Sequence, residues 1–522
     1  MKSRTVFIDI LSPAKRLQLD ALIAAWVFAD ALFWFWWLQP SHISQPFLFF
    51  LNSLFLSWTT VMPIYFFFFL RRMKKPNPAL SIPREWRVAM VTTRAPSEPF
   101  EVLKKTLRAM LAQETPHDTW LADEDPSEEI VRWCEANDVF ICSRRGAPQY
   151  HRNEWPRRKK CKEGNLAWFY DNFGYKHYDF VSQLDGDHVP TSGYLEAMLR
   201  PFHDPTVGYV TAPSICSNNA RNSWIARGRL YLEATLHGVI QAGCNDGYVS
   251  VCIGSHYAVR TKALQMSGGL GPELAEDNST SLLLASHGWQ GRHSIDAIAH
   301  GDGPNTFSDG IVQEFQWARS LVMILLLWTP KYLPRLPLRQ KFQFLFGQCW
   351  YFGFSLTWLL AFTIAPLAIL LKTPFANVNY LEFVLHASLP TLASLAIFYW
   401  IKAQRLLRPV DAKILNWEVA AFQLCRWPWV LCAVYDAVRV SIVRSTLEWK
   451  VTPKNVRARG VPFRLIAPYF LIIVLSFFVI VLEKTPATHA YLWLSFINGL
   501  TYIGLLFLIF QQETKNKQKE GY

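Results

Sequence analysis

One segment of the chain, which reads Tyr178-Asp179-Phe180-Val181-Ser182-Gln183-Leu184-Asp185-Gly186-Asp187-His188-Val189-Pro190, predicts a buried strand that ends in two acids. Its apolar and aromatic run is short enough for a single strand, and the glycine and proline that follow are typical of a turn. In an open α/β sheet, ligands bind at the carboxyl edge of the strands. We therefore expect Asp185 and Asp187 at a ligand-binding edge.

Two carboxylates at this spacing offer hard oxygen ligands for a divalent cation. Mg²⁺ is usually held by one or two carboxylates together with phosphate oxygens of the ligand, and Mn²⁺ takes similar donors. The hypothesis for Asp185 and Asp187 is therefore a site for Mg²⁺ or Mn²⁺ and a diphosphate. A simple Asp-Gly-Asp turn is the commoner explanation of an isolated pair, so the other motifs must decide between the two.

The composition indicates a membrane protein. The 522 residues are 51% hydrophobic and 15% aromatic, which is more than a purely soluble chain needs. The nine cysteines form no C-x-x-C pair, so neither a zinc site nor a disulfide framework is expected. Much of the formal net charge of +13 lies beside apolar segments, which favours a membrane surface over nucleic acid as the partner.

Six apolar segments are long enough to cross a bilayer, at about 21–38, 47–70, 350–371, 383–401, 465–482 and 491–510. Basic residues flank the first pair, and the short loop between its two members has none. The positive-inside rule therefore places the central domain and both termini in the cytoplasm of a plasma (inner) membrane protein. Charges and Pro428 interrupt segment 417–443, and a seventh span would carry the tail outside. We expect helices lying in the interface there.

Between residues 84 and 320, short strand-like runs alternate with helical ones. We expect strands at 88–92, 139–142, 180–184, 207–211 and 249–253, and helices at 100–111, 166–173 and 279–287. This alternation predicts a doubly wound, mostly parallel α/β sheet. The expected organisation is a pair of spans (1–75), the sheet domain (84–320), an interface helix region (321–343), a second pair of spans (344–401), interface helices with a loop (402–462), a third pair of spans (463–511) and a tail (512–522).

Two candidate sites lie upstream of the acid pair. The run 120–125 is an apolar strand that ends in acids, and Asp123 is suited to accept a hydrogen bond from the N3–H of a uracil; helix-capping acids in a loop are the alternative. Residues 157–165 place five cations ahead of a helix, an arrangement that binds a diphosphate. A solvated basic surface or a lipid contact explains 157–160, but less easily Lys162 followed by Gly-Asn.

Two further candidates lie downstream. A glycine-rich turn delivers Glu276 and Asp277 to the start of a helix. There Asp277 is a candidate general base, a role that contributes typically ~10²- to 10⁴-fold in rate, or else a helix cap. Gln313 and Trp317 share one helix face, where an indole suits the apolar face of a sugar ring and an amide bonds hydroxyls or phosphate. An ordinary amphipathic helix is the alternative.

In this order, the motifs resemble those of the membrane-embedded, processive family-two glycosyltransferases, which include the cellulose, hyaluronan and chitin synthases. The bacterial cellulose synthase catalytic subunit is the branch that they resemble most. The matching positions are Asp123 for an acid pair, 162–165 for K-x-G-N, 185–187 for D-x-D, 275–277 for T-E-D, 313–317 for Q-x-x-R-W, and 449–454 for the F-x-V-T-x-K gating loop. The resemblance covers residues 88 to 510.

The resemblance implies a GT-A domain, a UDP-sugar donor, a growing polysaccharide as acceptor, and accessory export subunits as partners. It implies that the product is a β-linked polymer, cellulose-like by preference, exported through the protein's own transmembrane channel. The implied roles are nucleotide binding for Asp123 and Lys162, cation and diphosphate binding for Asp185 and Asp187, base catalysis in an inverting transfer for Asp277 beside Glu276, positioning of donor and acceptor for Gln313 and Trp317, and closure over the diphosphate for Thr452 and Lys454.

The chain departs from the family pattern at several positions. Gln316 stands where the pattern has Arg, which removes a cation that would stabilise the departing diphosphate; Arg319 is the nearest substitute. Ala275 replaces Thr, and Asp123-Glu124 replaces two aspartates. Two alternatives therefore stay open: a transferase that adds one sugar to a lipid or short glycan, and a transporter or scaffold that binds a nucleotide sugar without turnover.

Overall fold

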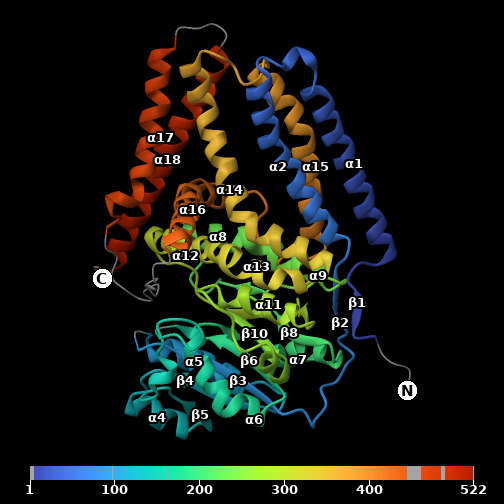
Figure 1. Cartoon of the computed structure of the whole chain (residues 1–522), viewed down its shortest axis with the longest axis vertical. Helices are drawn as coiled ribbons and strands as arrows, with labels where there is room; N and C mark the ends of the chain where they lie inside the picture. The colour runs from blue at the N-terminus through green and yellow to red at the C-terminus, as the bar shows by residue number, and fades with distance from the viewer. Residues whose placement is uncertain (1–4, 97, 160, 444–459, 484–487, 521–522) are drawn as a thin grey trace.

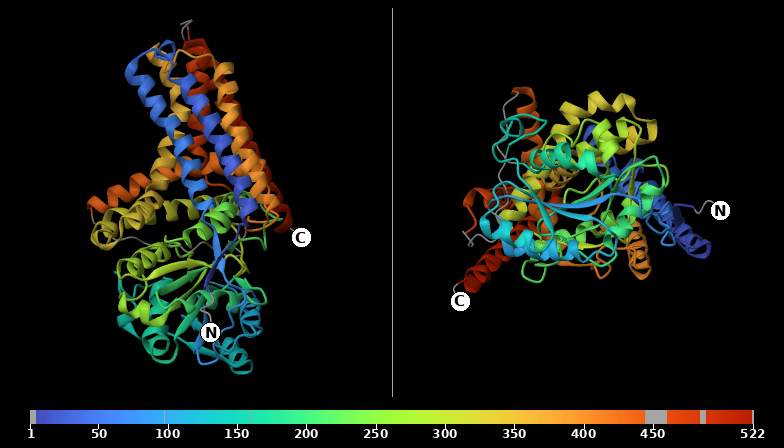
Figure 2. Two further views of the ribbon diagram at one scale, coloured as in Figure 1. Left: turned by 90° about the vertical axis from the view of Figure 1, so that its right-hand side faces the viewer. Right: turned by 90° about the horizontal axis from the view of Figure 1, so that it is seen from below.

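The chain divides into a helical bundle and a sheet domain, with a layer of crosswise helices between them (Figure 1). The computed structural model describes residues 5–96, 98–159, 161–443, 460–483 and 488–520. The long helices fill the upper half of Figure 1 and the sheet domain lies below them; Figure 2 shows the same two parts from the side and from below. Helix α1 (Pro13–Trp37) begins and helix α18 (His489–Glu520) ends on the sheet-domain side of the bundle (Figure 1).

Six long helices run side by side in the bundle (Figure 1). They are α1 (Pro13–Trp37), α2 (Pro46–Leu70), α14 (Leu338–Leu371), α15 (Tyr380–Ala403), α17 (Phe463–Leu482) and α18 (His489–Glu520). Each contains one of the six predicted spans. The 34-residue α14 starts well before its predicted span, because its first turns belong to the junction with the sheet domain. There Gln343 bonds both backbone groups of Val249, with Nε2 to the carbonyl oxygen at 2.6 Å and Oε1 to the amide nitrogen at 3.2 Å.

Among the described residues, seven helical segments are long and apolar enough to cross a membrane, one more than the sequence predicted. The additional segment, Phe307–Arg335, comprises α12 (Phe307–Met323), η6 (Ile324–Trp328), α13 (Thr329–Tyr332) and η7 (Leu333–Arg335). It lies across the base of the six long helices instead of alongside them (Figures 1 and 2).

Segment 417–443 forms one helix, α16 (Trp417–Val443), with Pro428 inside it. Like α12, it lies across the base of the bundle (Figures 1 and 2). Its charges, which interrupt the apolar run in the sequence, pair with neighbouring helices. Arg426 meets Glu314 of α12 at 2.9 Å, and Glu418 meets Arg227 of α8 (Trp224–Thr235) at 3.0 Å. These ion pairs fix α16 to the junction layer.

The sheet domain is built on a seven-stranded sheet in the order β11 (Gln290–His293), β8 (Val207–Thr211), β10 (His256–Arg260), β6 (Phe180–Asp185), β3 (Val88–Arg94), β4 (Asp118–Asp123) and β5 (Val139–Cys142). Strands β6, β3, β4 and β5 are parallel neighbours, and so are β8 and β11. Only β10 runs antiparallel to its neighbours among these described strands. The sheet is therefore mostly parallel, as predicted.

The two faces of the sheet are buried by helices. Val88 and Met90 of β3 pack in one core with α3 (Phe100–Leu111), α4 (Glu128–Glu135) and α7 (Tyr194–Leu199), while Ala89 and Val91 pack in another with α5 (Lys162–Phe169), α10 (Thr261–Met266) and α11 (Glu276–Ser286). Since successive side chains of a strand point to opposite faces, a strand covered on both sides must be apolar throughout. This explains the continuous apolar runs in the sequence.

The strand predicted at 249–253 is wrong. This segment has no regular structure, and the nearby strand is β10 at His256–Arg260. Side chains take the place of a neighbouring strand: Gln241 bonds the amide and carbonyl groups of Val251 at 3.1 and 2.9 Å, and Ser281 Oγ accepts from the amide of Cys252 at 2.7 Å. The segment therefore needs no strand ladder, because side chains of Gln241 and Ser281 satisfy its backbone groups.

Two small sheets complete the described strands. One has the order β7 (Val189–Pro190), β12 (Ala299–His300), β9 (Ser214–Ile215), and the other pairs β1 (Phe7–Asp9) with β2 (Lys74–Pro76). The remaining short helices are η1 (Pro40–His42), η2 (Pro148–Tyr150), η3 (Tyr170–Gly174), α6 (Tyr175–His177), η4 (Arg200–His203), η5 (Leu236–Ile240) and α9 (Gln241–Cys244).

Candidate active site

The candidate site begins at the carboxyl edge of the parallel strands. In the register of the sheet, Arg94 of β3 is opposite Asp123 of β4, and Thr93 of β3 is opposite Asp185 of β6. The two predicted acids therefore end the strands on either side of β3. This is the edge at which open α/β sheets bind ligands.

Lys162 joins this edge to the base candidate. It is the first residue of α5, and its Nζ donates to Oδ1 of Asp185 at 2.6 Å and to the carbonyl oxygen of Gly254 at 2.7 Å. The amide of Gly254 in turn donates to Oδ2 of Asp277 at 2.7 Å. Asp185, Lys162, Gly254 and Asp277 thus form one continuous set of polar contacts.

The start of α11 positions Asp277. The helix begins at Glu276, three residues before the predicted start, and its N-cap residue Ala275 has no side-chain hydrogen bond to offer. Asp277 Oδ1 accepts from the amide of Asn278 at 2.7 Å, while Oδ2 binds Gly254. One oxygen of this carboxylate therefore supports the first turn of the helix and the other binds the Gly254 loop, while its role as a base stays a prediction.

Burial and neighbouring charges shift the pKa values of these groups. Burial, opposed by hydrogen bonds from the amides of Asn278 and Gly254, raises the pKa of Asp277; burial together with the charge of Asp277 raises the pKa of Glu276. Burial disfavours the charged form of Lys162, but the carboxylates of Asp185 and Glu276 outweigh it and raise the pKa of its ammonium group. A carboxylate whose pKa is raised towards neutrality is a stronger proton acceptor, as a general base requires.

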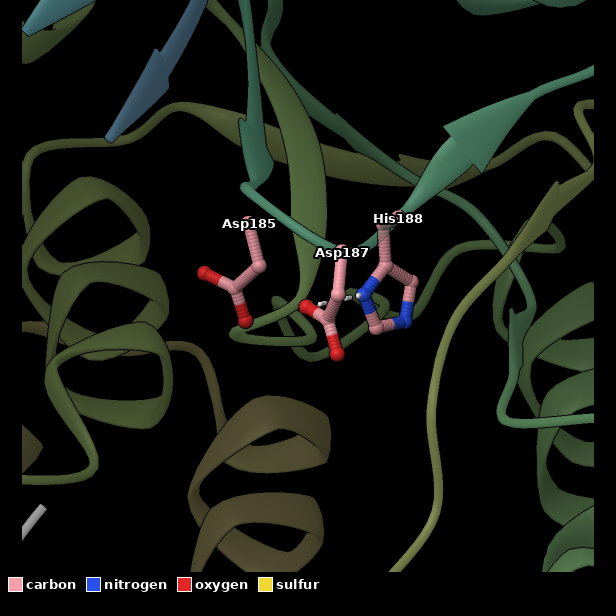
Figure 3. Close-up of side chains that lie close together, drawn as sticks. All are labelled: Asp185, Asp187 and His188. Atoms are coloured by element: carbon pink, nitrogen blue, oxygen red, sulfur yellow. Dashed lines mark hydrogen bonds and ion pairs between the residues drawn. The ribbon is translucent and has the colours of Figure 1, made fainter. Parts of the chain in front are cut away.

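Asp185, Asp187 and His188 lie together after β6 (Figure 3). One ligand atom from each lies within 4.8 Å of the others, and among the described residues this is the only such group of three acids, histidines or cysteines. The segment is indeed a turn, closed by the amide of His188 donating to the carbonyl oxygen of Asp185 at 3.0 Å, and Thr106 Oγ1 fixes it by donating to the carbonyl oxygen of Gly186 at 2.8 Å.

The donor set of this turn fits Mg²⁺ or Mn²⁺. Carboxylate oxygens are the ligands that both ions prefer, so Asp185 and Asp187 would hold the cation. His188 Nδ1 lies 3.3 Å from Oδ1 of Asp187 and its Nε2 lies 3.4 Å from Ser214 Oγ, which fixes the orientation of the imidazole beside the carboxylate. Sequence reasoning gave His188 no role, although its place directly after the acid pair was the available signal.

Asp123 is placed at the predicted edge but is already bonded. Its carboxylate is fully buried, accepts from Arg94 Nη1 at 3.2 and 3.1 Å, and accepts from the amide of Asp125 at 2.9 Å. Burial raises its pKa, and the backbone bond from Asp125 and the charge of Arg94 oppose that shift. Binding of a uracil by Asp123 therefore stays a prediction that requires Arg94 to share or release the carboxylate.

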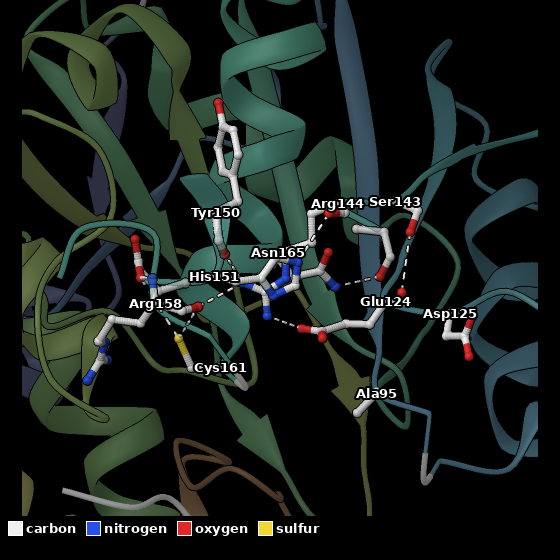
Figure 4. Close-up of polar contacts among 12 residues, drawn as sticks. Ala95, Glu124, Asp125, Ser143, Arg144, Tyr150, His151, Arg158, Cys161 and Asn165 are labelled. Carbon is white, nitrogen blue, oxygen red and sulfur yellow. Dashed lines mark hydrogen bonds and ion pairs between the residues drawn. The ribbon is translucent and has the colours of Figure 1, made fainter. Parts of the chain in front are cut away.

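A buried arginine explains the Gly-Asn that follows Lys162 (Figure 4). Arg144 donates to the carbonyl oxygens of Tyr150 and Arg158 at 2.7 Å each, and pairs with the carboxylate of Glu124. A Cβ on Gly164 would collide with Arg144 Nη1 and with the Arg158 carbonyl oxygen, so only glycine fits there.

The other residues of this motif hold the surrounding backbone. Asn165 Nδ2 donates to the carbonyl oxygen of Ala122 at 2.8 Å, and Glu163 accepts from the amides of Arg157 and Arg158 at 2.7 and 2.9 Å. Of the described cations at 157–162, Arg157 pairs with Asp171 at 2.8 Å and Lys162 with Asp185. Lys162 thus has a different partner from the basic residue Arg157: it contacts the strand-end acid Asp185, whereas Arg157 pairs with Asp171.

Gln313 and Trp317 lie on α12 in the junction layer, where both contact Arg229 of α8. Arg319, the predicted substitute for the missing family arginine, pairs with Asp436 of α16 at 2.8 Å. Thr452 and Lys454, predicted to close over a diphosphate, lie outside the described residues.

Comparison with known proteins gives the class. The sequence profile of the Glycosyl transferase family group 2 matches residues 180–401, a range that contains Asp185, Asp187, Asp277, Gln313 and Trp317. Residues 180–401 of the chain are therefore similar to the family-two glycosyltransferases.

Curated relatives of known name are also similar in sequence to this chain. It is 26% identical over 415 residues to the cellulose synthase 1 catalytic subunit [UDP-forming] of Komagataeibacter xylinus, which covers 73% of this chain and 48% of that one. It is 24% identical over 281 residues to the cellulose synthase catalytic subunit [UDP-forming] of Xanthomonas axonopodis pv. citri (strain 306), covering 52% of this chain and 36% of that one. The chain is thus distantly related to the bacterial cellulose synthase catalytic subunits and spans about half the length of these relatives or less.

Among solved structures, the chain is similar to a mannosyltransferase from Pyrobaculum calidifontis in complex with GDP-Man and Mn²⁺. The TM-score is 0.44 at 14% identity, and the match covers 81% of this chain and 99% of that one. It is also similar to glucosyl-3-phosphoglycerate synthase from Mycobacterium tuberculosis in complex with Mn²⁺, UDP and glucosyl-3-phosphoglycerate. That TM-score is 0.31 at 13% identity, covering 46% of this chain and 83% of that one.

Proposed function

We propose that the chain is a processive, inverting β-glycosyltransferase that polymerises a UDP-sugar into an extracellular polysaccharide, a cellulose-like β-glucan by preference. The observation that carries the proposal is the set of contacts from Asp185 through Lys162 and Gly254 to Asp277. It joins a candidate cation-binding acid, a partly buried ammonium group and a candidate base at one sheet edge.

The chemistry of each group suits one part of the reaction. Asp185 and Asp187 would hold Mg²⁺ or Mn²⁺, which supplies positive charge to the departing diphosphate when bound. Lys162 adds a fixed ammonium group beside Asp185, where it would contact the same phosphates. Asp277 would take the proton of the attacking sugar hydroxyl, and Glu276 beside it would keep the proton affinity of the pair high.

The arrangement of the two parts of the protein supports polymer export. Gln313 and Trp317, the candidate residues for positioning donor and acceptor, belong to the crosswise layer, directly beneath the bundle of long helices (Figure 1). A sugar chain extended at this layer would enter the bundle without crossing the aqueous phase. We propose on this basis that the bundle forms the export channel and that the sheet domain and both termini are cytoplasmic.

The test is product formation by the full chain in membranes supplied with labelled UDP-sugars and Mg²⁺ or Mn²⁺. Long polymer that a β-1,4-glucanase degrades supports the proposal, and resistance to that enzyme but not to another linkage-specific glycanase would change the assigned linkage. Products longer by a single sugar would instead indicate a transferase acting on a lipid or short glycan, and UDP-sugar binding without any product would indicate a scaffold or transporter. A reporter fused after Tyr522 checks the topology, and a periplasmic signal there would contradict it.

A second candidate, the transferase that adds a single sugar, is favoured by one observation. The position of the family arginine is occupied by Gln316, and Arg319 is engaged by Asp436. Without a cation at position 316 to stabilise the departing diphosphate, repeated rapid turnover would be harder to sustain than a single transfer.

A further inference from the structure

Arg229 of α8 contacts both of the α12 residues that the sequence assigns to the sugar site. Its Nη1 donates to Oε1 of Gln313 at 2.7 Å, and its guanidinium lies over the ring of Trp317, 4.1 Å from the ring centroid. The residue is only 7% exposed. One buried cation therefore fixes a glutamine and a tryptophan that are one helical turn apart.

The guanidinium is itself held from its own helix. Its Nε donates to Oε1 of Glu233 at 3.2 Å, and the other oxygen of Glu233 lies 3.6 Å from Nε2 of His237. The helix that carries these residues is fixed against α16, because a Cβ on Gly228 would collide with the backbone carbonyl of Glu418. Arg229 thus extends from a rigid base toward α12.

This contact determines which end of the Gln313 amide is turned toward Arg229. A guanidinium has only donors, so the amide must present its oxygen to it. The two Nε2–H donors of Gln313 are then directed away from Arg229. In the acceptor site they are the donors that a sugar hydroxyl would accept from.

The same contact determines which face of Trp317 Arg229 occupies. The guanidinium covers one face of the indole at the distance of a cation–π contact. A sugar ring that stacks on this indole must use the opposite face. The lateral position of the indole is also restricted, since a planar guanidinium and a planar ring stack in a narrow range of geometries.

We propose that Arg229 is the positioning residue of the acceptor site: it sets the donor end of Gln313 and the face of Trp317 that meet the sugar. The proposal rests on the proposed transferase function. It assigns Arg229 no contact with the reacting atoms, so donor chemistry in the absence of acceptor does not depend on it.

The test compares Arg229→Lys and Arg229→Gln with the matched control Arg227→Gln, which removes an arginine from the same helix whose partner is Glu418. Three quantities are measured on the full chain in nanodiscs: equilibrium binding of labelled cellotetraose, kcat and KM for cellotetraose, and release of UDP from UDP-glucose without acceptor. We expect both Arg229 variants to weaken cellotetraose binding and raise its KM by about tenfold, as loss of one stacked and bonded anchor implies. UDP release should stay within about twofold of wild type.

Lysine keeps the charge opposite Glu233 but lacks the planar fork, so Arg229→Lys should retain the thermal midpoint and still lose cellotetraose binding. The double variant with Trp317→Ala gives a second readout. If Arg229 acts through the indole, Arg229→Gln should add little to the binding loss already caused by Trp317→Ala. Additive losses would show a general structural role and overturn the proposal.

Two further results would also overturn it: cellotetraose binding equal to wild type in Arg229→Gln, or UDP release that falls in step with binding. Absence of UDP release by the wild type from any UDP-sugar contradicts the proposed function, not the role of Arg229. In that case the binding measurements alone decide. Loss of cellotetraose binding in the Arg229 variants supports the role of Arg229. Binding that is unchanged in the variants, or absent in the wild type, refutes it.

Discussion

The Nζ of Lys162 lies 2.6 Å from Oδ1 of Asp185, although the two residues are 23 positions apart and belong to different elements. Lys162 begins α5, and Asp185 ends β6. The contact brings a helix N-terminus, a strand end and, through Gly254, the start of α11 to one place. The proposed chemistry depends on this convergence.

Lys162→Met should weaken UDP binding by about tenfold to hundredfold, because hydrogen bonds to charged groups are worth about 1.5–3 kcal/mol. The variant removes the ammonium group but keeps a side chain of similar length. Lys262→Met, at an exposed lysine of α10, is the matched control and should bind UDP as the wild type does. Calorimetric titration with UDP and Mn²⁺ measures both, and equal affinities in the two variants would remove Lys162 from the diphosphate site.

Asp277→Asn should retain UDP binding and lower the rate of transfer by about 10²- to 10⁴-fold, the contribution of a general base. Asparagine can still accept a hydrogen bond from the Gly254 amide, so the loop should keep its position. The measurement is a comparison of UDP affinity with labelled-sugar incorporation. Undiminished incorporation would exclude Asp277 as the base.

The pH dependence of transfer should show the raised proton affinity of this pair. Burial raises the pKa of Asp277 above that of an ordinary aspartate, and the base must be unprotonated to act. Activity should therefore fall with decreasing pH at a pH clearly above about 3.9, where an exposed aspartate titrates. Because Glu276 interacts with Asp277, the fall reports the pair and not one residue. A profile of kcat that stays flat down to about pH 4 would contradict this prediction.

Gly164→Ala should destabilise the protein by about 1–3 kcal/mol, the typical cost of overpacking. The added methyl group would meet Arg144 and the Arg158 carbonyl oxygen. Gly347→Ala is the matched control: no atom lies within 4 Å of the added Cβ, and alanine favours the helix. Thermal unfolding in detergent distinguishes them. A midpoint unchanged in Gly164→Ala would mean that the Arg144 network relaxes to admit the methyl group.

The sequence predicts the parts of this structure that local pattern controls. Strands β5 and β8 match their predicted bounds to the residue, and helix α3 matches the predicted 100–111. These elements are short, mostly apolar runs or have helical spacing of apolar residues. The predicted strand 249–253 fails because its alternating pattern is satisfied by Gln241 and Ser281, side chains that come from other elements.

In the candidate site, too, some features could be predicted from the sequence and others could not. The acids at strand ends could be found from sequence, since a strand delivers its last residues to the sheet edge. The contacts of Arg94 with Asp123, of Arg144 with Glu124 and of Arg229 with Trp317 could not. Each joins residues from separate elements, and no motif marks the arginine. Only the three-dimensional packing determines where those guanidinium groups lie.

The central claim is that Asp185 and Asp187 bind a cation and a nucleotide sugar whose sugar is transferred. The most direct measurement is release of UDP from UDP-glucose and other UDP-sugars by the full chain, with and without Mn²⁺ or Mg²⁺, in wild type and Asp187→Asn. The account predicts release that EDTA abolishes, that either cation restores, and that Asp187→Asn lacks. Release that persists in EDTA and in Asp187→Asn, or no release from any UDP-sugar by wild type, would contradict it.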